Sequence, residues 1–101
     1  MKNKKSSTVP KNLQGILWSA DVKNLNLEKD KIYIIHQVLM YGDLKEIAWL
    51  LRVYSKKEIS NVFKGSPMKI YSPQAFNFIK NIILGLKKEP LPSEKYVASL
   101  Y

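Results

Sequence analysis

The sequence predicts an all-α fold, a small bundle of four to five short helices. Apolar residues recur at spacings of three and four along several segments, which places them on one face of a helix. Serine or aspartate precedes glutamate by three residues at two helix starts, the spacing of a capping box. No segment predicts a partner strand for a sheet. Together these observations favour helices throughout the chain.

The composition is that of one small globular domain. A chain of 101 residues, 46% of them hydrophobic, has room for a single modest core. No apolar run approaches the roughly 18 residues that cross a bilayer, so we expect no membrane partner. The absence of cysteine fits a cytoplasmic location. We expect a disordered basic arm at residues 1–9, which have little to bury, and a single helical domain at residues 10–101.

The first helix is predicted at residues 28–41, after a short helical turn and an irregular segment. Gly42 would end this helix in the left-handed conformation. Residues 31–41 are also rich enough in β-branched and aromatic side chains to form a buried strand. This alternative stays open, although a helix is favoured because no partner strand is evident. The apolar face of the helix comprises Ile32, Ile35, Val38 and Leu39.

Two further helices are predicted in close succession. The first covers residues 43–53, with Asp43 and Glu46 at the cap and N3 positions. The second begins after Ser55, which forms a second capping box with Glu58 and leads to a stop at Gly65. Their apolar faces comprise Leu44, Ile47, Ala48 and Leu51 in the first helix and Ile59, Val62 and Phe63 in the second.

The last long helix is predicted to start at Pro73, with Ser72 as its cap and Gly85 at its end. It is apolar on most sides, which is typical of a central helix or of an oligomer surface. Ser93 can cap a final short helix. The residues expected on one side of that helix are Tyr96, Val97 and Leu100.

Few residues offer the chemistry of an enzyme. His36 is the only histidine, and its place among apolar residues is typical of a core or boundary histidine. The carboxylates of Asp43, Glu46 and Glu58 already serve as helix caps. The sequence has no His/Cys cluster and no glycine-rich phosphate loop. We therefore expect no enzyme, no catalytic residue, no metal site and no cofactor.

The net charge of +9 is unevenly distributed. Residues 1–11 carry four lysines and no acid, whereas residues 12–55 balance five basic against five acidic side chains. Residues 56–101 carry eight lysines against three glutamates. The positive second half favours a polyanion such as nucleic acid, an anionic membrane surface or an acidic protein as partner.

Residues 46–62 resemble the general helix-turn-helix repressor pattern, in which a second helix lies in the major groove of double-stranded DNA. Ala48 supplies the small residue of the first helix. Two departures are Arg52, where a turn glycine is usual, and Tyr54, which lengthens the turn by about one residue. The lysines of the second helix would contact phosphates, and its asparagine an adenine edge. The outward face of this helix supplies the candidate DNA-binding residues: Lys56, Lys57, Ser60, Asn61 and Lys64.

An ordinary solvated lysine face is the alternative for that helix. Candidate contacts to a protein partner come from other segments. Trp49 lies off the apolar stripe of its helix and could anchor a partner or a second subunit, although tryptophan is more often a core residue. Phe78 and Ile82 are candidates on the apolar helix that starts at Pro73.

Several motifs of residues 9–84 point to a further resemblance. They are the P-x-x-L start, Trp18 followed by Asp21, the I-I-x-x-V-L-x-x-G-D junction at residues 34–43, and S-P-x-x-F-N-F at residues 72–78. With these motifs the chain resembles a family of small uncharacterised prokaryotic all-helical proteins, often encoded beside nucleotidyltransferase-type toxins of abortive-infection systems. The resemblance implies an antitoxin-like or regulatory role and no catalytic residues.

The resulting hypothesis is a small DNA-binding transcriptional regulator, or an antitoxin-like protein of a toxin–antitoxin or phage-defence system. It would bind double-stranded DNA and a toxin or other protein, and a homodimer is a possible state. The alternative is a non-enzymatic protein–protein interaction module, toxin-neutralising or adaptor, without specific DNA binding.

Overall fold

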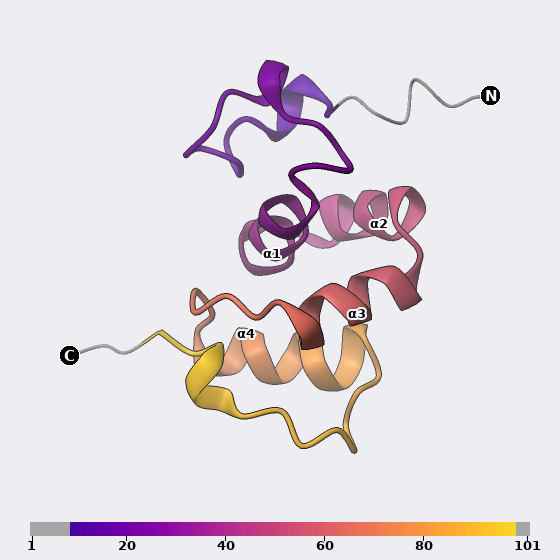
Figure 1. Cartoon of the computed structure of the whole chain (residues 1–101), viewed down its shortest axis with the longest axis vertical. Helices are drawn as coiled ribbons and strands as arrows, with labels where there is room; N and C mark the ends of the chain where they lie inside the picture. The colour runs from indigo at the N-terminus through magenta and orange to yellow at the C-terminus, as the bar shows by residue number, and fades with distance from the viewer. Residues whose placement is uncertain (1–8, 99–101) are drawn as a thin grey trace. The chain divides into compact units, whose positions relative to one another are not determined.

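The computed structural model describes residues 9–98, and this part of the chain is all-α (Figure 1). A π-helical turn, η4, directly continues the fourth α-helix. The only β-type pairing among the described residues is an isolated parallel bridge between Tyr71 and Val97. The predicted all-α class is therefore confirmed. The elements are η2 (Lys11–Leu13), η3 (Val22–Asn24), α1 (Lys31–Tyr41), α2 (Leu44–Val53), α3 (Lys56–Gly65), α4 (Pro73–Phe78), η4 (Ile79–Ile83) and η5 (Ser93–Lys95).

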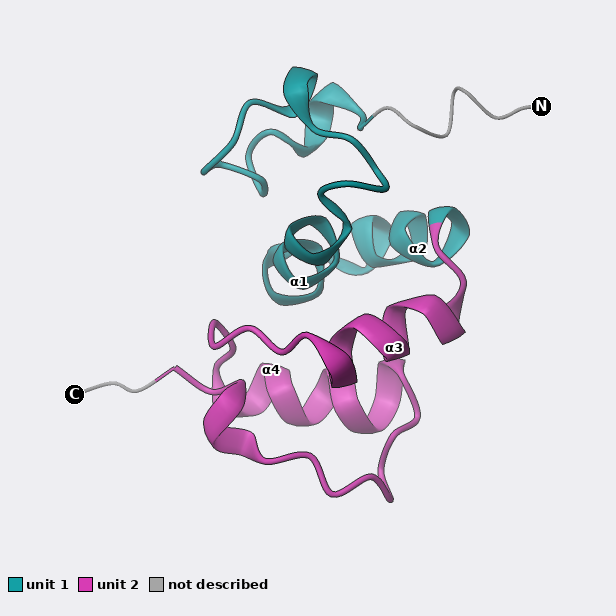
Figure 2. Cartoon of the chain, viewed as in Figure 1, with its two compact units in different colours: residues 1–53 teal, residues 54–101 magenta. Residues whose placement is uncertain are grey.

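The chain divides into two compact units, residues 1–53 and residues 54–101 (Figure 2). α1 and α2 belong to unit 1, and α3 and α4 belong to unit 2. The boundary thus separates the two helices for which the sequence predicts a helix-turn-helix-like pair, and that pairing stays a prediction. The basic arm predicted at residues 1–9 lies outside the described residues except for Val9, whose side chain is buried.

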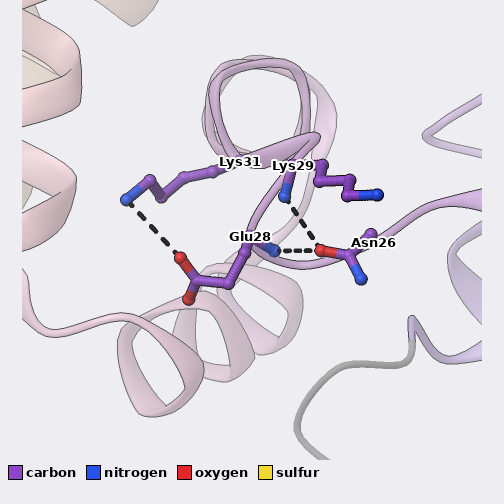
Figure 3. Close-up of polar contacts among 4 residues, drawn as sticks. All are labelled: Asn26, Glu28, Lys29 and Lys31. Carbon is purple, nitrogen blue, oxygen red and sulfur yellow. Dashed lines mark hydrogen bonds and ion pairs between the residues drawn. The ribbon is translucent and has the colours of Figure 1, made fainter.

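The turn before α1 explains why this helix begins at Lys31 and not at residue 28. The side-chain oxygen of Asn26 accepts the N–H groups of Glu28 at 2.8 Å and Lys29 at 2.9 Å (Figure 3). The Asp30 carboxylate in turn accepts the N–H of Asn26 at 2.8 Å. With the N–H of Asp30 donating to the carbonyl of Asn26 at 2.9 Å, these bonds close one capped turn. Asp30 then has a φ of −105° and a ψ of 20°, outside the helical region, so α1 begins only after it. The helix predicted in preference to a strand at residues 31–41 is confirmed.

α1 is buried on all sides along its middle. Every residue from 34 to 39 is buried, including His36, as expected for a core histidine. Ile32, predicted on the apolar face, is instead 44% exposed, because it lies in the first turn of α1, before the buried stretch begins. In unit 1, α1 packs against α2.

One stripe of α1, with side chains four residues apart, holds the irregular segment at residues 16–19. The Tyr33 hydroxyl accepts a hydrogen bond from Ser19 at 2.7 Å. The Gln37 amide donates one to the carbonyl of Ile16 at 3.1 Å, the partner that a buried amide needs to offset its lost hydration. The Tyr41 ring makes an edge contact with Trp18, with 4.5 Å between the ring centroids.

Gln14 gives the same segment its shape. Its amide nitrogen donates to the carbonyls of Leu17 at 3.1 Å and Ala20 at 2.7 Å, and its oxygen accepts the N–H of Val22 at 3.1 Å. One side chain thus satisfies three backbone groups that no regular element pairs.

Four aromatic side chains gather in unit 2. The Tyr96 ring stacks on Phe63 and Phe76, with centroids 4.6 Å and 4.9 Å away, and Tyr71 meets Phe63 edge-on at 5.7 Å. The Tyr96 hydroxyl donates to the carbonyl of Phe63 at 2.6 Å, near the end of α3. Burial, and secondarily the neighbouring Tyr96, raises the pKa of Tyr71 above its usual value. This cluster joins α3, α4 and the C-terminal segment.

α4 and η4 form one continuous helical stretch in unit 2. Ser72 caps it by accepting the N–H of Ala75 at 3.1 Å, as predicted, and Gly85 ends it at a φ of 64°. Phe76 and Ile79 are buried, whereas Phe78 and Ile82 are exposed, so of the two predicted alternatives the stretch is not a central helix buried on all sides, and the oligomer surface stays a prediction. The final helix is only the 3-10 turn η5, in which Ser93 is the first residue and not the cap. Leu100, predicted there, lies outside the described residues.

We predict that Tyr96→Phe lowers the free energy of unfolding by about 1–2 kcal/mol, because it leaves the buried carbonyl of Phe63 without this donor. Urea unfolding monitored by circular dichroism measures the change. Tyr33→Phe is the matched control, since its hydroxyl bond to Ser19 is exposed and should contribute less. An equal loss in both variants would contradict the assignment.

A pair of glycine substitutions tests the end of α1. Gly42 has a φ of −80° and not the left-handed conformation predicted for it. A Cβ there would lie 2.7 Å from the carbonyl oxygen of Val38, so Gly42→Ala should destabilise by about 1–3 kcal/mol. At helical Gly65 a Cβ meets nothing within 4 Å, and Gly65→Ala should be neutral or stabilise by up to about 1 kcal/mol. Thermal unfolding of both variants measures the contrast, and equal effects would contradict it.

Candidate functional site

α3 carries a polar face opposite its buried stripe. The helix begins after Ser55, whose hydroxyl oxygen accepts the N–H of Glu58 at 3.0 Å, as the predicted cap requires. Lys57, Asn61 and Lys64 are exposed and follow each other at spacings of four and three. We call these three residues the α3 polar face. The buried stripe, as predicted, comprises Ile59, Val62 and Phe63.

The other two candidate DNA-binding residues lie at the edges of this face. Ser60 is half-buried. Lys56 is exposed, but its Nζ lies 3.6 Å from where a Cβ on Gly85 would stand. That position is near the carboxyl end of η4, where a helix dipole favours a cation. The structure therefore brings all five residues onto one helix and places three of them at the centre of the exposed side.

α2 begins at a complete capping box. The Asp43 carboxylate accepts the N–H of Glu46 at 3.1 Å and that of Lys45 at 3.0 Å, and the Glu46 carboxylate accepts the N–H of Asp43 at 2.7 Å. The hydrogen bond from the Glu46 N–H is the main cause that holds the pKa of Asp43 below its ordinary value of 3.8. The predicted start of this helix is confirmed.

The buried side of α2 is rotated from the predicted one. Ile47 and Leu50 are buried, whereas Leu44 is 71% exposed and Ala48 is also exposed. Leu44 is the first residue of the helix, and Ala48 lies one turn further along the same side. A stripe centred on Ile47 and Leu50 leaves both of them facing outward.

Trp49 stands in the wall of a small pocket of unit 1. The side chain is half-buried, between the exposed anchor and the core position that the sequence leaves open, and its role in partner binding stays a prediction. Lys45, Trp49 and Arg52 follow one face of α2, and the opposite wall comes from the segment around η2. The pocket has a volume of about 140 Å³. We call it the α2 pocket, and it is lined by Pro10, Asn12, Leu13, Lys45, Glu46, Trp49 and Arg52.

Sequence reasoning missed this pocket. The spacing of Lys45, Trp49 and Arg52 was visible as one helical face. The opposite wall was not, because it comes from residues about 35 positions earlier, and no local pattern links the two segments.

Phe78 and Ile82 are exposed on the stretch formed by α4 and η4. Their exposed fractions are 43% and 68%, and their spacing of four places them on one side. The structure therefore supports the placement of these two predicted contact residues at the surface. These two residues belong to unit 2, whereas Trp49 belongs to unit 1.

No other chemistry is evident within residues 9–98. No group of three or more His, Cys, Asp or Glu side chains in this range could hold a metal ion. No helix described here has the length and apolar character that crossing a membrane requires.

The model of a family of unknown function, DUF6922, matches residues 13–63. The chain belongs to this family. The DUF6922 match contains α1, α2 and α3 up to Phe63, and therefore Lys57, Asn61 and most of the α2 pocket. Lys64, Phe78 and Ile82 lie beyond it. Searches of curated proteins and of solved structures found no match.

We predict an acid-dependent contribution from Asp43. Because its folded-state pKa is lowered, this carboxylate stabilises the fold fully above a pH of about 4 and loses the effect as the pH falls through the folded pKa. The stability difference between wild type and Asp43→Asn should shrink as the pH falls from about 6 to about 2. Urea unfolding across this range measures it, and a difference that does not change with pH would contradict it.

Proposed function

We propose that this DUF6922 protein is a small cytoplasmic DNA-binding regulator or antitoxin-like protein and not an enzyme. The supporting observation is the α3 polar face, in which Lys57, Asn61 and Lys64 are exposed together opposite a buried stripe. In this proposal double-stranded DNA is the ligand of that face.

The chemistry of the face fits a duplex. Two lysine ammonium groups can neutralise phosphates along the backbone. Between them in sequence, the amide of Asn61 offers both a donor and an acceptor, the pair that matches the major-groove edge of adenine. α3 has 10 residues, so it is about 15 Å long and of a size that enters a major groove.

The charge of unit 2 supports the same ligand. Residues 54–101 hold eight lysines and three glutamates. Such an excess attracts a polyanion over a distance of about a Debye length, which raises its local concentration before any specific contact forms.

A second candidate function is protein binding without DNA. The exposed apolar pair of Phe78 and Ile82 favours it, because apolar residues four apart on one helix side are the anchors of helix recognition. A toxin or a second copy of the chain would contact this pair. The motifs resemble a family of small proteins that are often encoded beside toxins, and this resemblance supports a toxin as that partner.

We predict that the protein binds a mixed-sequence DNA duplex with strong salt dependence. Lys57→Ala/Lys64→Ala should reduce the slope of log affinity against log salt concentration by about two, close to one for each phosphate that the variant no longer neutralises. Asn61→Ala should weaken binding to a preferred sequence and leave that slope unchanged. Fluorescence anisotropy at several salt concentrations measures both effects.

The matched control is Lys23→Ala/Lys29→Ala, which removes the same charge from exposed positions of unit 1. If the control loses as much affinity as the α3 variant, the binding reflects net charge and not this face. If wild type binds no duplex but Phe78→Ser/Ile82→Ser abolishes a complex with a co-purified protein, the second candidate function replaces the first.

A further inference from the structure

The α2 pocket collects hydrogen-bond donors from two segments of unit 1. Lys45, Trp49 and Arg52 lie on one face of α2 at spacings of four and three. Asn12 faces them from the segment around η2. The residues that line this small space therefore carry an ammonium, an indole N–H, a guanidinium and a carboxamide.

Within the described residues, no hydrogen bond or ion pair engages the side chains of Asn12, Lys45, Trp49 or Arg52. The Lys45 ammonium does interact electrostatically with the Asp43 carboxylate at the start of the same helix. The Trp49 indole is half-buried, and an indole N–H in that position usually finds an acceptor. Asn12, Lys45 and Arg52 are exposed, so an incoming acceptor would replace the water that now solvates their donors.

The charge of the lining selects an anion. Two cations and one carboxylate, that of Glu46, belong to the lining, and the Asp43 carboxylate next to Lys45 offsets part of the positive charge. One oxygen of the Glu46 carboxylate already accepts the N–H of Asp43 at 2.7 Å in the capping box. The lining therefore keeps a net positive charge, with the guanidinium fork suited to a carboxylate.

We infer that the α2 pocket binds the carboxylate side chain of a glutamate or aspartate in an acidic segment of a partner protein. The volume of about 140 Å³ is below that of pockets for cofactors and drug-sized ligands, and fits one side chain. Leu13, Pro10 and the indole supply apolar contacts for the methylene groups of that side chain. A phosphate has no such apolar stem. The inference does not depend on DNA binding by α3.

The test uses NMR on the full-length ¹⁵N-labelled protein, with an acetylated and amidated tetrapeptide of glutamate as probe. The same peptide of glutamine is the neutral control. The glutamate peptide should shift the Trp49 indole N–H signal in a saturable way. The other tryptophan, Trp18, packs against Tyr41 and provides an internal reference that should not move.

Three variants test the charge logic. Arg52→Gln should weaken binding of the glutamate peptide by about tenfold, the loss expected for one charge-assisted contact. Lys23→Gln removes the same charge from another exposed position of unit 1 and should change the affinity by less than about twofold. Glu46→Gln keeps an oxygen that can cap Asp43 but removes the repelling charge, so it should strengthen binding.

Several results would overturn the inference. One is a shift of the Trp49 indole signal by the glutamine peptide that equals the shift by the glutamate peptide. Another is an equal loss of affinity for the glutamate peptide in Arg52→Gln and Lys23→Gln. A stronger Trp49 response to inorganic phosphate or to a DNA duplex than to the glutamate peptide would assign the pocket to phosphate instead. If Arg52→Gln fails to fold, Glu46→Gln still decides, because unchanged or weaker peptide binding in that variant contradicts the inference.

Discussion

Side-chain caps at the starts of α2 and α3 are the constraint on which the candidate sites depend. The first N–H groups of a helix have no partner inside the helix, and Asp43 and Ser55 accept them. A cap fixes the residue at which a helix begins, and the helical repeat then sets which side chains share a face. Lys45, Trp49 and Arg52 share one face of α2 after the Asp43 cap, and Lys57, Asn61 and Lys64 share one face of α3 after the Ser55 cap. Packing then decides which face of each helix is buried.

Unit 1 combines a buried helix with a segment that has almost no regular structure. α1 is enclosed along its middle, and its buried amide Gln37 finds the carbonyl of Ile16. Gln14 satisfies three further backbone groups of the same segment. Polar side chains thus hold residues that a regular element would otherwise pair, and residues 10–13, which come just before that segment, supply one wall of the α2 pocket.

Unit 2 concentrates its packing in aromatic rings. Tyr96 stacks on two phenylalanines and bonds the carbonyl of Phe63, so the C-terminal segment is tied to α3 by both dispersion and a hydrogen bond. Because α3 buries its apolar side, which includes Phe63 of this aromatic cluster, its lysines and its asparagine face solvent. Phe78 and Ile82 also stay at the surface, which gives this unit two chemically different exposed regions.

The sequence by itself determined the four α-helices, the starts of α2, α3 and α4, and the core position of His36. The reason is that capping boxes, serine before proline and apolar spacing act within a few residues. Tertiary structure decided which apolar residues are buried, since Ile32 and Leu44 are exposed although their spacing predicts otherwise. It also decided the α2 pocket, because segments about 35 residues apart meet there through packing that no local pattern encodes.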